Sequence, residues 1–264
     1  MTNSCPTFVD IHCHLLPQID DGARDWEESL AMARLAVAEG IRTVIVTPHQ
    51  LGNYGRNRGE TIRARAAEFG RLLDEHSVPL QVLPGADVRI EPDLVRKIRS
   101  GDVVTLADQR RYVLLELPHE VYLPLERLLG ELASAGIAGI LSHPERNQGI
   151  LGQPRVLAGL LDRGCLMQIT AGSLVGTFGP QSQELAERMV VQGHVHFVAT
   201  DAHGAKARRP LMRRAYERVA QLVGAEKAGQ LCSANPACVA TGRKLASPGR
   251  APAGGGWFRW RKAS

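Results

Sequence analysis

The chain has 264 residues, of which 44% are hydrophobic, so it is long and apolar enough for one large domain with a buried core. The formal net charge is +5, but residues 247–264 carry four basic residues and no acid, which leaves +1 for residues 1–246. A nearly neutral body gives no support for a nucleic-acid-binding surface, which would show a basic stripe. We therefore expect no nucleic-acid partner.

The five cysteines are odd in number and scattered, and no two of them form a C-x-x-C pair. This pattern is typical of a reducing compartment and argues against a structural zinc ribbon. Residues 1–20 lack a basic start followed by an apolar run, so we expect no signal peptide. No stretch approaches the roughly 18 apolar residues of a membrane span. Together these features predict a cytoplasmic protein.

Seven short apolar, β-branched runs predict strands near Phe8–His12, Thr43–Thr47, Leu80–Leu83, Tyr112–Leu117, Ala138–Ser142, Cys165–Thr170 and Val195–Thr200. Helical patterns lie between most of them, at Asp25–Glu39, Thr61–Glu75, Pro124–Ala135, Pro154–Arg163, Gln181–Gln192 and Arg209–Leu222. In the first helical pattern Asp25 can cap the first turn, Glu28 follows as in a capping box, and Gly40 can close the end.

Alternation of strands and helices indicates parallel strands joined by right-handed crossovers, and seven such units predict an α/β barrel. An open doubly wound sheet is the alternative. From about Ser247 the composition changes, because SPGRAPAGGG is typical of a flexible linker and WFRWRKAS is aromatic and basic. We therefore divide the chain into a barrel, residues 1–246, and a C-terminal tail, residues 247–264.

The tail has two interpretations. The favoured one is a disordered, solubilising end. The alternative is a weak tether to a membrane or a membrane-bound partner, because aromatic rings favour the headgroup level of a bilayer and basic side chains are attracted to anionic lipid.

Six of the seven predicted strands place a histidine or an acid at or just past their C-terminal ends. His12 and His14 end the first strand and share a face, because side chains two apart on a strand point the same way, whereas Cys13 points away. The later strands supply His49, Asp87, Glu116, His143, and Asp201 with His203. Barrel enzymes build their active sites at this end of the strands.

Glu116 is a charge in the otherwise apolar run VLLELP, and a metal ion relieves the cost of burying such a carboxylate. Asp21 completes the candidate ligand set, and Asp20 is the alternative, although we favour a loop-forming role for Asp20. Imidazole and carboxylate ligands without thiolate suit Mn, Fe or Zn. The set is too large for one ion, so we expect two or three divalent ions that share a bridging carboxylate.

The remaining histidines lack this placement. We interpret His76, His194 and His196 as surface or packing residues, whereas His119, just past the strand that ends in Glu116, is a candidate for the rim of the site.

In these residues the chain resembles the PHP superfamily of metal-dependent phosphoesterases. Within it, the chain is similar to the manganese-dependent tyrosine phosphatases of bacterial capsule and exopolysaccharide loci, the CpsB/CapC-type family. The resemblance is carried by VDIHCHLLPQIDDGARDWEESLAMARLAVAEGI, VTPH at 46–49, LPGADVRI at 83–90, LLELP at 114–118, SHPERN at 142–147, QITAGSL at 168–174, TDAHG at 200–204, and Arg209-Pro210. These stretches come in family order and cover residues 8 to about 242.

The resemblance implies a distorted (β/α)7 TIM-like barrel with a closing helix at Asn235-Pro236. It also implies a three-metal centre, usually with Mn2+, that hydrolyses phosphotyrosine on membrane tyrosine autokinases. The family's ligands fall on His12, His14, Asp21, His49, Asp87, Glu116, His143, Asp201 and His203. Its phosphate-binding arginines fall on Arg146 and Arg209, with Arg208 as the alternative to Arg209. The family usually has glutamate where this chain has Asp87, which puts the occupancy of one ion in question.

The mechanism that we expect is direct attack on phosphorus by a metal-bridging hydroxide, with the arginines neutralising the developing charge. The cysteine-dependent route to the same reaction needs C-x5-R, and no cysteine here has an arginine six residues on. Two alternatives remain at this stage: a small-molecule phosphatase of the same superfamily, such as one acting on histidinol phosphate, and a non-catalytic barrel that binds a kinase.

Overall fold

The structure is a computed structural model that describes residues 7–245. The tail predicted at 247–264 lies outside the described residues. All strand pairs are parallel and form two sheets, one with the order β1-β2-β4 and the other with the order β3-β5-β6-β7-β8-β9. The strands are β1 (Phe8–Cys13), β2 (Ile41–Val46), β3 (His49–Gln50), β4 (Gln81–Pro84), β5 (Asp87–Arg89), β6 (Tyr112–Glu116), β7 (Ala138–Ser142), β8 (Leu166–Thr170) and β9 (Phe197–Ala199).

All seven predicted strands are present, with ends that differ from the prediction by at most two residues. The two additional strands, β3 and β5, start just after Thr47-Pro48 and Gly85-Ala86 and so prolong β2 and β4. Gly85 lies at one of these breaks, where a Cβ atom would come within 2.6 Å of Ile45 Cγ2. Each break shifts the chain from one sheet to the other, which carries His49 and Asp87 on to the second sheet.

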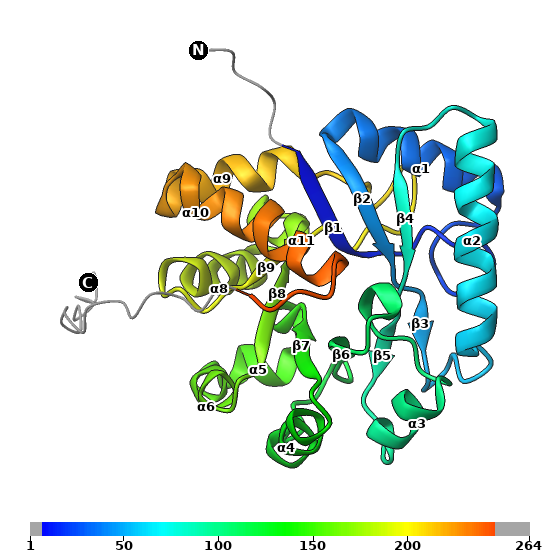
Figure 1. Cartoon of the computed structure of the whole chain (residues 1–264). Coiled ribbons are helices and arrows are strands. Elements are labelled where there is room, and N and C mark those ends of the chain that lie inside the picture. The colour runs from blue at the N-terminus through cyan, green and yellow to red at the C-terminus, as the bar shows by residue number, and fades with distance from the viewer. Residues whose placement is uncertain (1–6, 246–264) are drawn as a thin grey trace.

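The helices lie outside the curled sheets (Figure 1). They are α1 (Trp26–Glu39), α2 (Gly59–Glu75), α3 (Leu94–Ser100), α4 (Glu126–Ser134), α5 (Gln148–Gly152), α6 (Val156–Asp162), α7 (Ala171–Leu174), α8 (Pro180–Val191), α9 (Arg213–Val223), α10 (Ala225–Gly229) and α11 (Asn235–Ala240). Shorter helical turns occur at η1 (Leu106–Asp108), η2 (Pro144–Arg146) and η3 (Gln230–Ala234). None of the helices among residues 7–245 is long and apolar enough to cross a membrane.

The predicted ends of α1 are confirmed. Asp25 accepts a hydrogen bond from Glu28 N (2.8 Å), and Gly40 closes the helix in the left-handed conformation (φ 98°). The capping box is only half formed, because the Glu28 carboxylate accepts from Arg24 N instead of from Asp25 N. The prediction for α9 is wrong at its start: the helix begins at Arg213, four residues later than expected.

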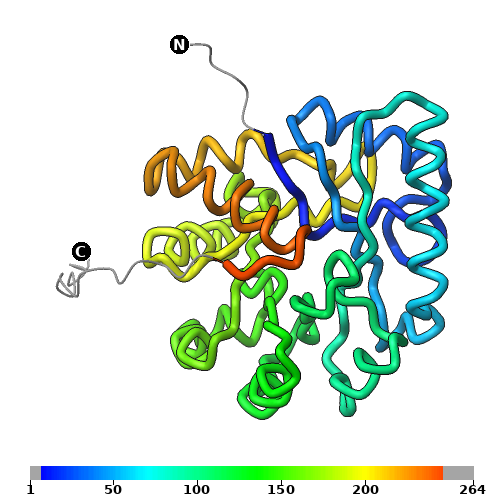
Figure 2. The backbone as a smooth tube through the Cα atoms, viewed as in Figure 1, coloured from blue at the N-terminus to red at the C-terminus, as the bar shows by residue number. Residues whose placement is uncertain are grey.

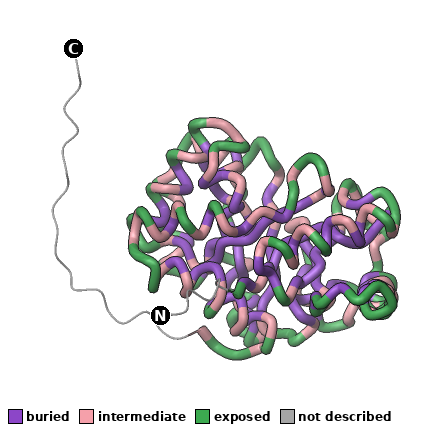
Figure 3. The backbone as a smooth tube through the Cα atoms, turned by 90° about the horizontal axis from the view of Figure 1, so that it is seen from above, coloured by how far each residue is buried: buried purple, intermediate pink, exposed green. Residues whose placement is uncertain are grey.

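The core consists of two clusters of buried side chains, and successive residues of a strand belong alternately to one cluster and to the other. In β6, for example, Tyr112 and Leu114 belong to the inner cluster, and Val113 and Leu115 belong to the outer cluster beneath the helices. The buried residues accordingly run through the middle of the molecule, and exposed residues lie at its edge (Figure 3). Glu116 is the next residue in the inward-facing series of β6, at the carboxyl end of the strand.

The amino ends of the strands are covered by the last part of the described chain. Helix α11 contacts β1, and η3 contacts β1 and β9 (Figure 2). Ser233 Oγ donates to Thr7 O, and Tyr112 Oη, at the start of β6, donates to Arg243 O. The opposite, carboxyl ends carry the predicted site. The fold is therefore a mixed α/β structure with a curled parallel sheet, and its finer description as a (β/α)7 barrel stays a prediction.

Candidate metal centre

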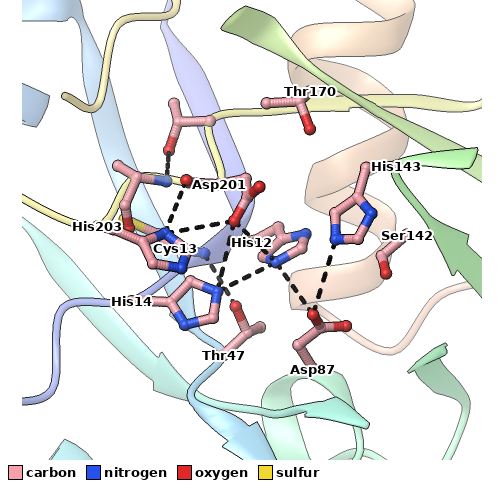
Figure 4. A network of polar contacts seen from close by, with 12 residues as sticks. His12, Cys13, His14, Thr47, Asp87, Ser142, His143, Thr170, Asp201 and His203 are labelled. Carbon is pink, nitrogen blue, oxygen red and sulfur yellow. Dashed lines mark hydrogen bonds and ion pairs between the residues drawn. The ribbon is translucent and has the colours of Figure 1, made fainter. Parts of the chain in front are cut away.

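The nine predicted ligands all converge at the carboxyl ends of the strands. Their ligand atoms fall into overlapping groups, within each of which the atoms lie no more than 4.8 Å apart. The groups are His14, Asp21, His49 and His203; His12, His14 and Asp87; His12, His143 and Asp201; and His49, Asp87 and Glu116. Figure 4 shows the imidazoles of His12, His14, His143 and His203 turned toward the carboxylates of Asp87 and Asp201.

A register shift in β1, between Asp10 and Cys13, helps to place the first two ligands. Such a bulge breaks the strict alternation of side chains, so that Ile11 can join the inner core while the next residue, His12, reaches the site. His12 Nε2 and His14 Nε2 lie 3.2 Å apart, and Cys13 packs in the outer core as predicted.

Asp87 lies at the centre of the site. Its Oδ2 atom is 3.5 Å from His12 Nε2, 3.5 Å from His49 Nδ1 and 3.9 Å from His143 Nε2. The side chain is fully buried, and neither carboxylate oxygen has a hydrogen-bond partner; His49 Nδ1 is buried and unpartnered as well. Burial, together with the nearby charge of Glu116, raises the pKa of Asp87 well above its usual value. These unpartnered atoms fit cation binding, which satisfies them together.

Three of the histidines have an oxygen acceptor at Nδ1, the ring nitrogen that does not face the site. His12 Nδ1 lies 2.8 Å from Gln168 Oε1, and His14 Nδ1 lies 2.7 Å from Asp20 Oδ2. His203 Nδ1 lies 3.0 Å from the carbonyl oxygen of Asp201. An Nδ1–H that donates to oxygen leaves the Nε2 lone pair free for a metal ion. The arrangement therefore sets both the tautomer and the orientation of each ring.

Burial keeps most of these imidazoles neutral. It lowers the pKa of His12 to about 3 and that of His49 to about 4, and it lowers the pKa of His143 well below the usual value. His14 differs: burial again opposes its charged form, but the charge of Asp20 and the hydrogen bond to it raise the His14 pKa to about 10. Metal binding at His14 would consequently displace a proton.

Asp201 pairs with two arginines in this structure. Arg208 Nη2 lies 2.6 Å from Asp201 Oδ2, and Arg146 Nη1 contacts the same oxygen. Burial disfavours the Asp201 carboxylate, but His12, His14 and Arg208 hold its pKa well below the usual range. Asp201 and Arg208 have left-handed backbones (φ 49° and 47°), a conformation that non-glycine residues adopt at a cost and often near functional sites.

A pocket opens on these groups, and we call it the metal pocket. Its walls include six of the predicted ligands together with His119, Arg146 and Arg208. His119 therefore lines this pocket, in agreement with its prediction as a residue at the rim of the site. Arg209 does not line this pocket; its side chain is exposed and lines a neighbouring cavity. The structure thus places the alternative residue, Arg208, beside the predicted ligands, and a phosphate-binding role for either arginine stays a prediction.

Two positioning residues were missed at the sequence level. Gln168 lies on β8, the one predicted strand that supplies no ligand, and its amide oxygen holds His12 instead. Asp20 was assigned to loop formation, and it does accept from Gly22 N (2.9 Å), but it also pairs with His14 and accepts from His49 N (3.0 Å). The signal for Asp20 was its place next to a ligand-rich motif, which does not reveal its partner, whereas Gln168 lies on a strand without ligands and gave no signal.

Comparison with known proteins gives a consistent result. The family model for capsular polysaccharide synthesis, CpsB/CapC, matches residues 8–241. Tyrosine-protein phosphatase YwqE of Bacillus subtilis is 40% identical over 203 residues, covering 76% of this chain and 79% of that protein. Tyrosine-protein phosphatase CpsB of Streptococcus pneumoniae is 29% identical over 235 residues, covering 87% and 96%.

A solved structure is similar throughout. It comes from the crystal structures of YwqE from Bacillus subtilis and CpsB from Streptococcus pneumoniae, described as unique metal-dependent tyrosine phosphatases. The TM-score is 0.86 at 35% sequence identity, and the match covers 90% of this chain and 96% of the other.

Proposed function

Because the chain belongs to the CpsB/CapC family of capsular polysaccharide synthesis, we propose that it is a metal-dependent protein-tyrosine phosphatase. The observation that carries the proposal is the convergence of nine histidine and carboxylate side chains, six of which line one pocket together with Arg146 and Arg208. Cations beside arginines are suited to a phosphoryl group, whose oxygens carry negative charge in the ground state and the transition state.

The proposed ligands are His12, His14, Asp21, His49, Asp87, Glu116, His143, Asp201 and His203. Divalent ions bound there supply positive charge for the phosphoryl oxygens and lower the pKa of a water molecule toward neutrality. Mn2+ is the ion that we propose, with Fe or Zn as alternatives, because the donors are imidazole and carboxylate without thiolate. Asp87, whose Oδ2 atom lies within 4 Å of His12, His49 and His143, would help to hold the ions.

The remaining side chains orient the ligands and the substrate. Gln168 and Asp20 hold His12 and His14 with Nε2 toward the site. Arg146 and Arg208 present N–H donors to the pocket, where the forked guanidinium geometry matches phosphate oxygens. The leaving tyrosinate has an intrinsic pKa near 10, so it needs only modest protonation as it departs.

Closure of the sheet into a (β/α)7 barrel belongs to the same proposal. It is supported by a parallel bridge between Cys13 and Ala202, which joins the end of β1 to the segment after β9. Backbone hydrogen bonds from His14 N to Ala202 O (2.8 Å) and from Asp201 N to His12 O (2.7 Å) continue this contact.

The substrate that we propose is a phosphotyrosine protein, in particular a membrane tyrosine autokinase that controls capsule or exopolysaccharide synthesis. The family's description in capsular polysaccharide synthesis supports this choice. A cytoplasmic location is supported by the free thiols of the four cysteines in the described part of the chain. We also propose the division into residues 1–246 and a tail, and the end of the family match at residue 241 supports it.

The test compares two phosphate esters on one preparation of the full chain supplied with Mn2+. We expect a phosphotyrosine peptide to be hydrolysed with a much higher kcat/KM than histidinol phosphate. A preference for histidinol phosphate would instead indicate a small-molecule phosphatase. Absence of turnover of either ester by metal-loaded protein would indicate a non-catalytic barrel.

A further inference from the structure

A second cavity adjoins the metal pocket, and we call it the basic cavity. Arg208 lines both, and Thr200, in the wall of the basic cavity, directly precedes the metal-site residue Asp201. The other walls come from the 172–178 segment and from the loop and helix after β9. The basic cavity therefore lies next to the metal pocket, on the other side of Arg208.

The lining of the basic cavity carries one sign of charge. It contains Lys206, Arg208, Arg209 and Arg214 and no acidic residue. Arg208 is paired with Asp201. Lys206, Arg209 and Arg214 form no ion pair with another residue of the described range 7–245, and their side chains are exposed. Because the chain from 1 to 246 is nearly neutral, this is a local excess of positive charge rather than a general property of the surface.

Another cavity with basic walls shows the contrast. The cavity that contains Arg58, Arg63 and Arg110 is also lined by Glu60, Asp102 and Asp108. There Arg63 forms an ion pair with Asp108 at 2.7 Å. The wall of that cavity thus carries acids beside its cations, whereas Lys206, Arg209 and Arg214 of the basic cavity have no acid in the same lining.

An aromatic ring of the basic cavity packs against two arginines of the metal pocket. The ring centroid of Phe178 lies 4.0 Å from Arg146 Cζ and 5.8 Å from Arg208 Cζ. Phe178 also lines the basic cavity, with Val175 and Leu211 as further apolar neighbours. An apolar wall with cations at its edge accommodates the stem of an amino-acid side chain whose end is anionic.

We propose that the basic cavity is a substrate subsite that binds an anionic side chain, a carboxylate or a second phosphoryl group, close in sequence to the phosphotyrosine. The inference rests on the proposed phosphatase function, because it takes the phosphotyrosine to occupy the metal pocket. Successive residues of an extended peptide are roughly 3.3 Å apart. A substrate residue one to three positions from the phosphotyrosine can therefore place its side chain in the basic cavity while the phosphotyrosine occupies the metal pocket. The subsite selects substrates and takes no part in the chemical step.

The experiment measures kcat and KM for three phosphotyrosine peptides of equal length. One peptide has neutral flanking residues, the second has glutamates on both sides, and the third has a second phosphotyrosine. The variant is Lys206→Glu/Arg214→Glu, which leaves Arg146, Arg208 and Arg209 intact. The matched control is Arg155→Glu/Arg163→Glu, which makes the same charge change at exposed arginines that line neither the basic cavity nor the metal pocket.

We expect the unmodified chain to prefer at least one anionic peptide over the neutral one by about tenfold in kcat/KM, mainly through KM. The Lys206→Glu/Arg214→Glu variant should lose this preference and keep its kcat/KM on the neutral peptide, and the control should retain the preference. Comparison of the two anionic peptides identifies which anion the subsite takes. Higher salt should reduce the preference, because the cations are exposed.

Equal rates of the unmodified chain on all three peptides would overturn the subsite, as would an unchanged preference in the Lys206→Glu/Arg214→Glu variant. Loss of preference in the control as well would assign the effect to net charge and also overturn it. Failure of the proposed function is a separate result, because the unmodified chain would then hydrolyse none of the three peptides, including the neutral one.

Discussion

His12 and His14 face each other through Nε2, and each holds an oxygen acceptor on Nδ1. The acceptors come from separate parts of the chain, Gln168 from β8 and Asp20 from the loop after β1. The convergence of the candidate ligands was predictable, because histidines and acids at strand ends are conspicuous in a sequence. The acceptors were not, because glutamine or aspartate near a motif has many other roles and only the folded structure reveals the ring that it holds.

The role of Gln168 can be tested directly. Gln168→Leu removes the acceptor for His12 Nδ1–H at nearly constant size, and we expect affinity for Mn2+ to fall about 10- to 100-fold. Gln168→Glu is the matched control, because it restores an acceptor and should recover most of the affinity. Titration calorimetry of metal-free protein with Mn2+ measures the change. Unaltered affinity in the leucine variant would remove Gln168 from the positioning role.

Asp87 is the residue where this chain departs from the family pattern that its sequence otherwise resembles. Its carboxylate is buried and unpartnered within 3.5 Å of two histidines, so an ion can be held here despite the shorter side chain. We expect Asp87→Glu to bind Mn2+ at least as tightly as the unmodified chain, with the same number of ions per chain by elemental analysis. Strong loss of metal would show that the site is built around aspartate.

Arg146 and Arg208 line the metal pocket and Arg209 does not, so we expect substitutions of these arginines to differ in their effect on kcat/KM. Arg146→Ala and Arg208→Ala should each lower kcat/KM on a phosphotyrosine peptide by about 10- to 100-fold, since a hydrogen bond to a charged group contributes about 1.5–3 kcal/mol. Arg209→Ala should have a smaller effect, because Arg209 does not line the metal pocket. Metal content should stay unchanged in all three. A larger loss in Arg209→Ala than in Arg208→Ala would reverse the assignment.

At the scale of elements, the seven main strands were predictable because each is a compact apolar, β-branched run. The short helices α3, α5, α7 and α10 were not expected, since four to seven residues are too few for a helical periodicity to stand out. The start of α9 was placed four residues too early, at Arg209 instead of Arg213. In the structure the segment 209–212 forms the loop that brings Arg208 to the pocket, and Glu39 accepts from the backbone N–H groups of Met212 and Arg213.

The cap of α1 offers a test at this scale. Asp25→Ala removes the side-chain acceptor for Glu28 N, and we expect the free energy of unfolding to fall by about 1 kcal/mol. Urea denaturation of metal-free protein measures the change. Asp25 lies outside the metal pocket, so metal content and kcat should not change. A destabilisation close to zero would mean that the helix end is satisfied by water.

At the scale of the molecule, the two ends of the strands have different roles. The amino ends are packed beneath α11 and η3, whereas the carboxyl ends gather ligands from both sheets. The first and last strands are tied together by Asp10, whose buried carboxylate accepts from Thr200 N (3.0 Å) and from His12 N (3.3 Å). This contact fixes His12 relative to Asp201, residues that are far apart in the sequence. Sequence periodicity predicted the strands but carried no information on this contact.

Because the candidate ligands come from many strands and loops, we expect bound metal ions to join these elements and stabilise the fold. Ions that bind only the folded state raise its stability according to their concentration and affinity. Chelation should therefore lower the melting temperature of the full chain, and Mn2+ should restore it in a concentration-dependent way. The control is a cation without affinity for imidazole, such as Na+ at equal ionic strength, which should not restore it.

The central claim is that bound divalent ions are required for hydrolysis of phosphotyrosine. The most direct measurement strips one preparation with a chelator, restores Mn2+ in steps, and follows metal content and hydrolysis of a phosphotyrosine peptide together. We predict no activity without metal and activity that rises with occupancy to two or three ions per chain. Full activity in the stripped protein, or metal binding at this stoichiometry without any hydrolysis, would contradict the account.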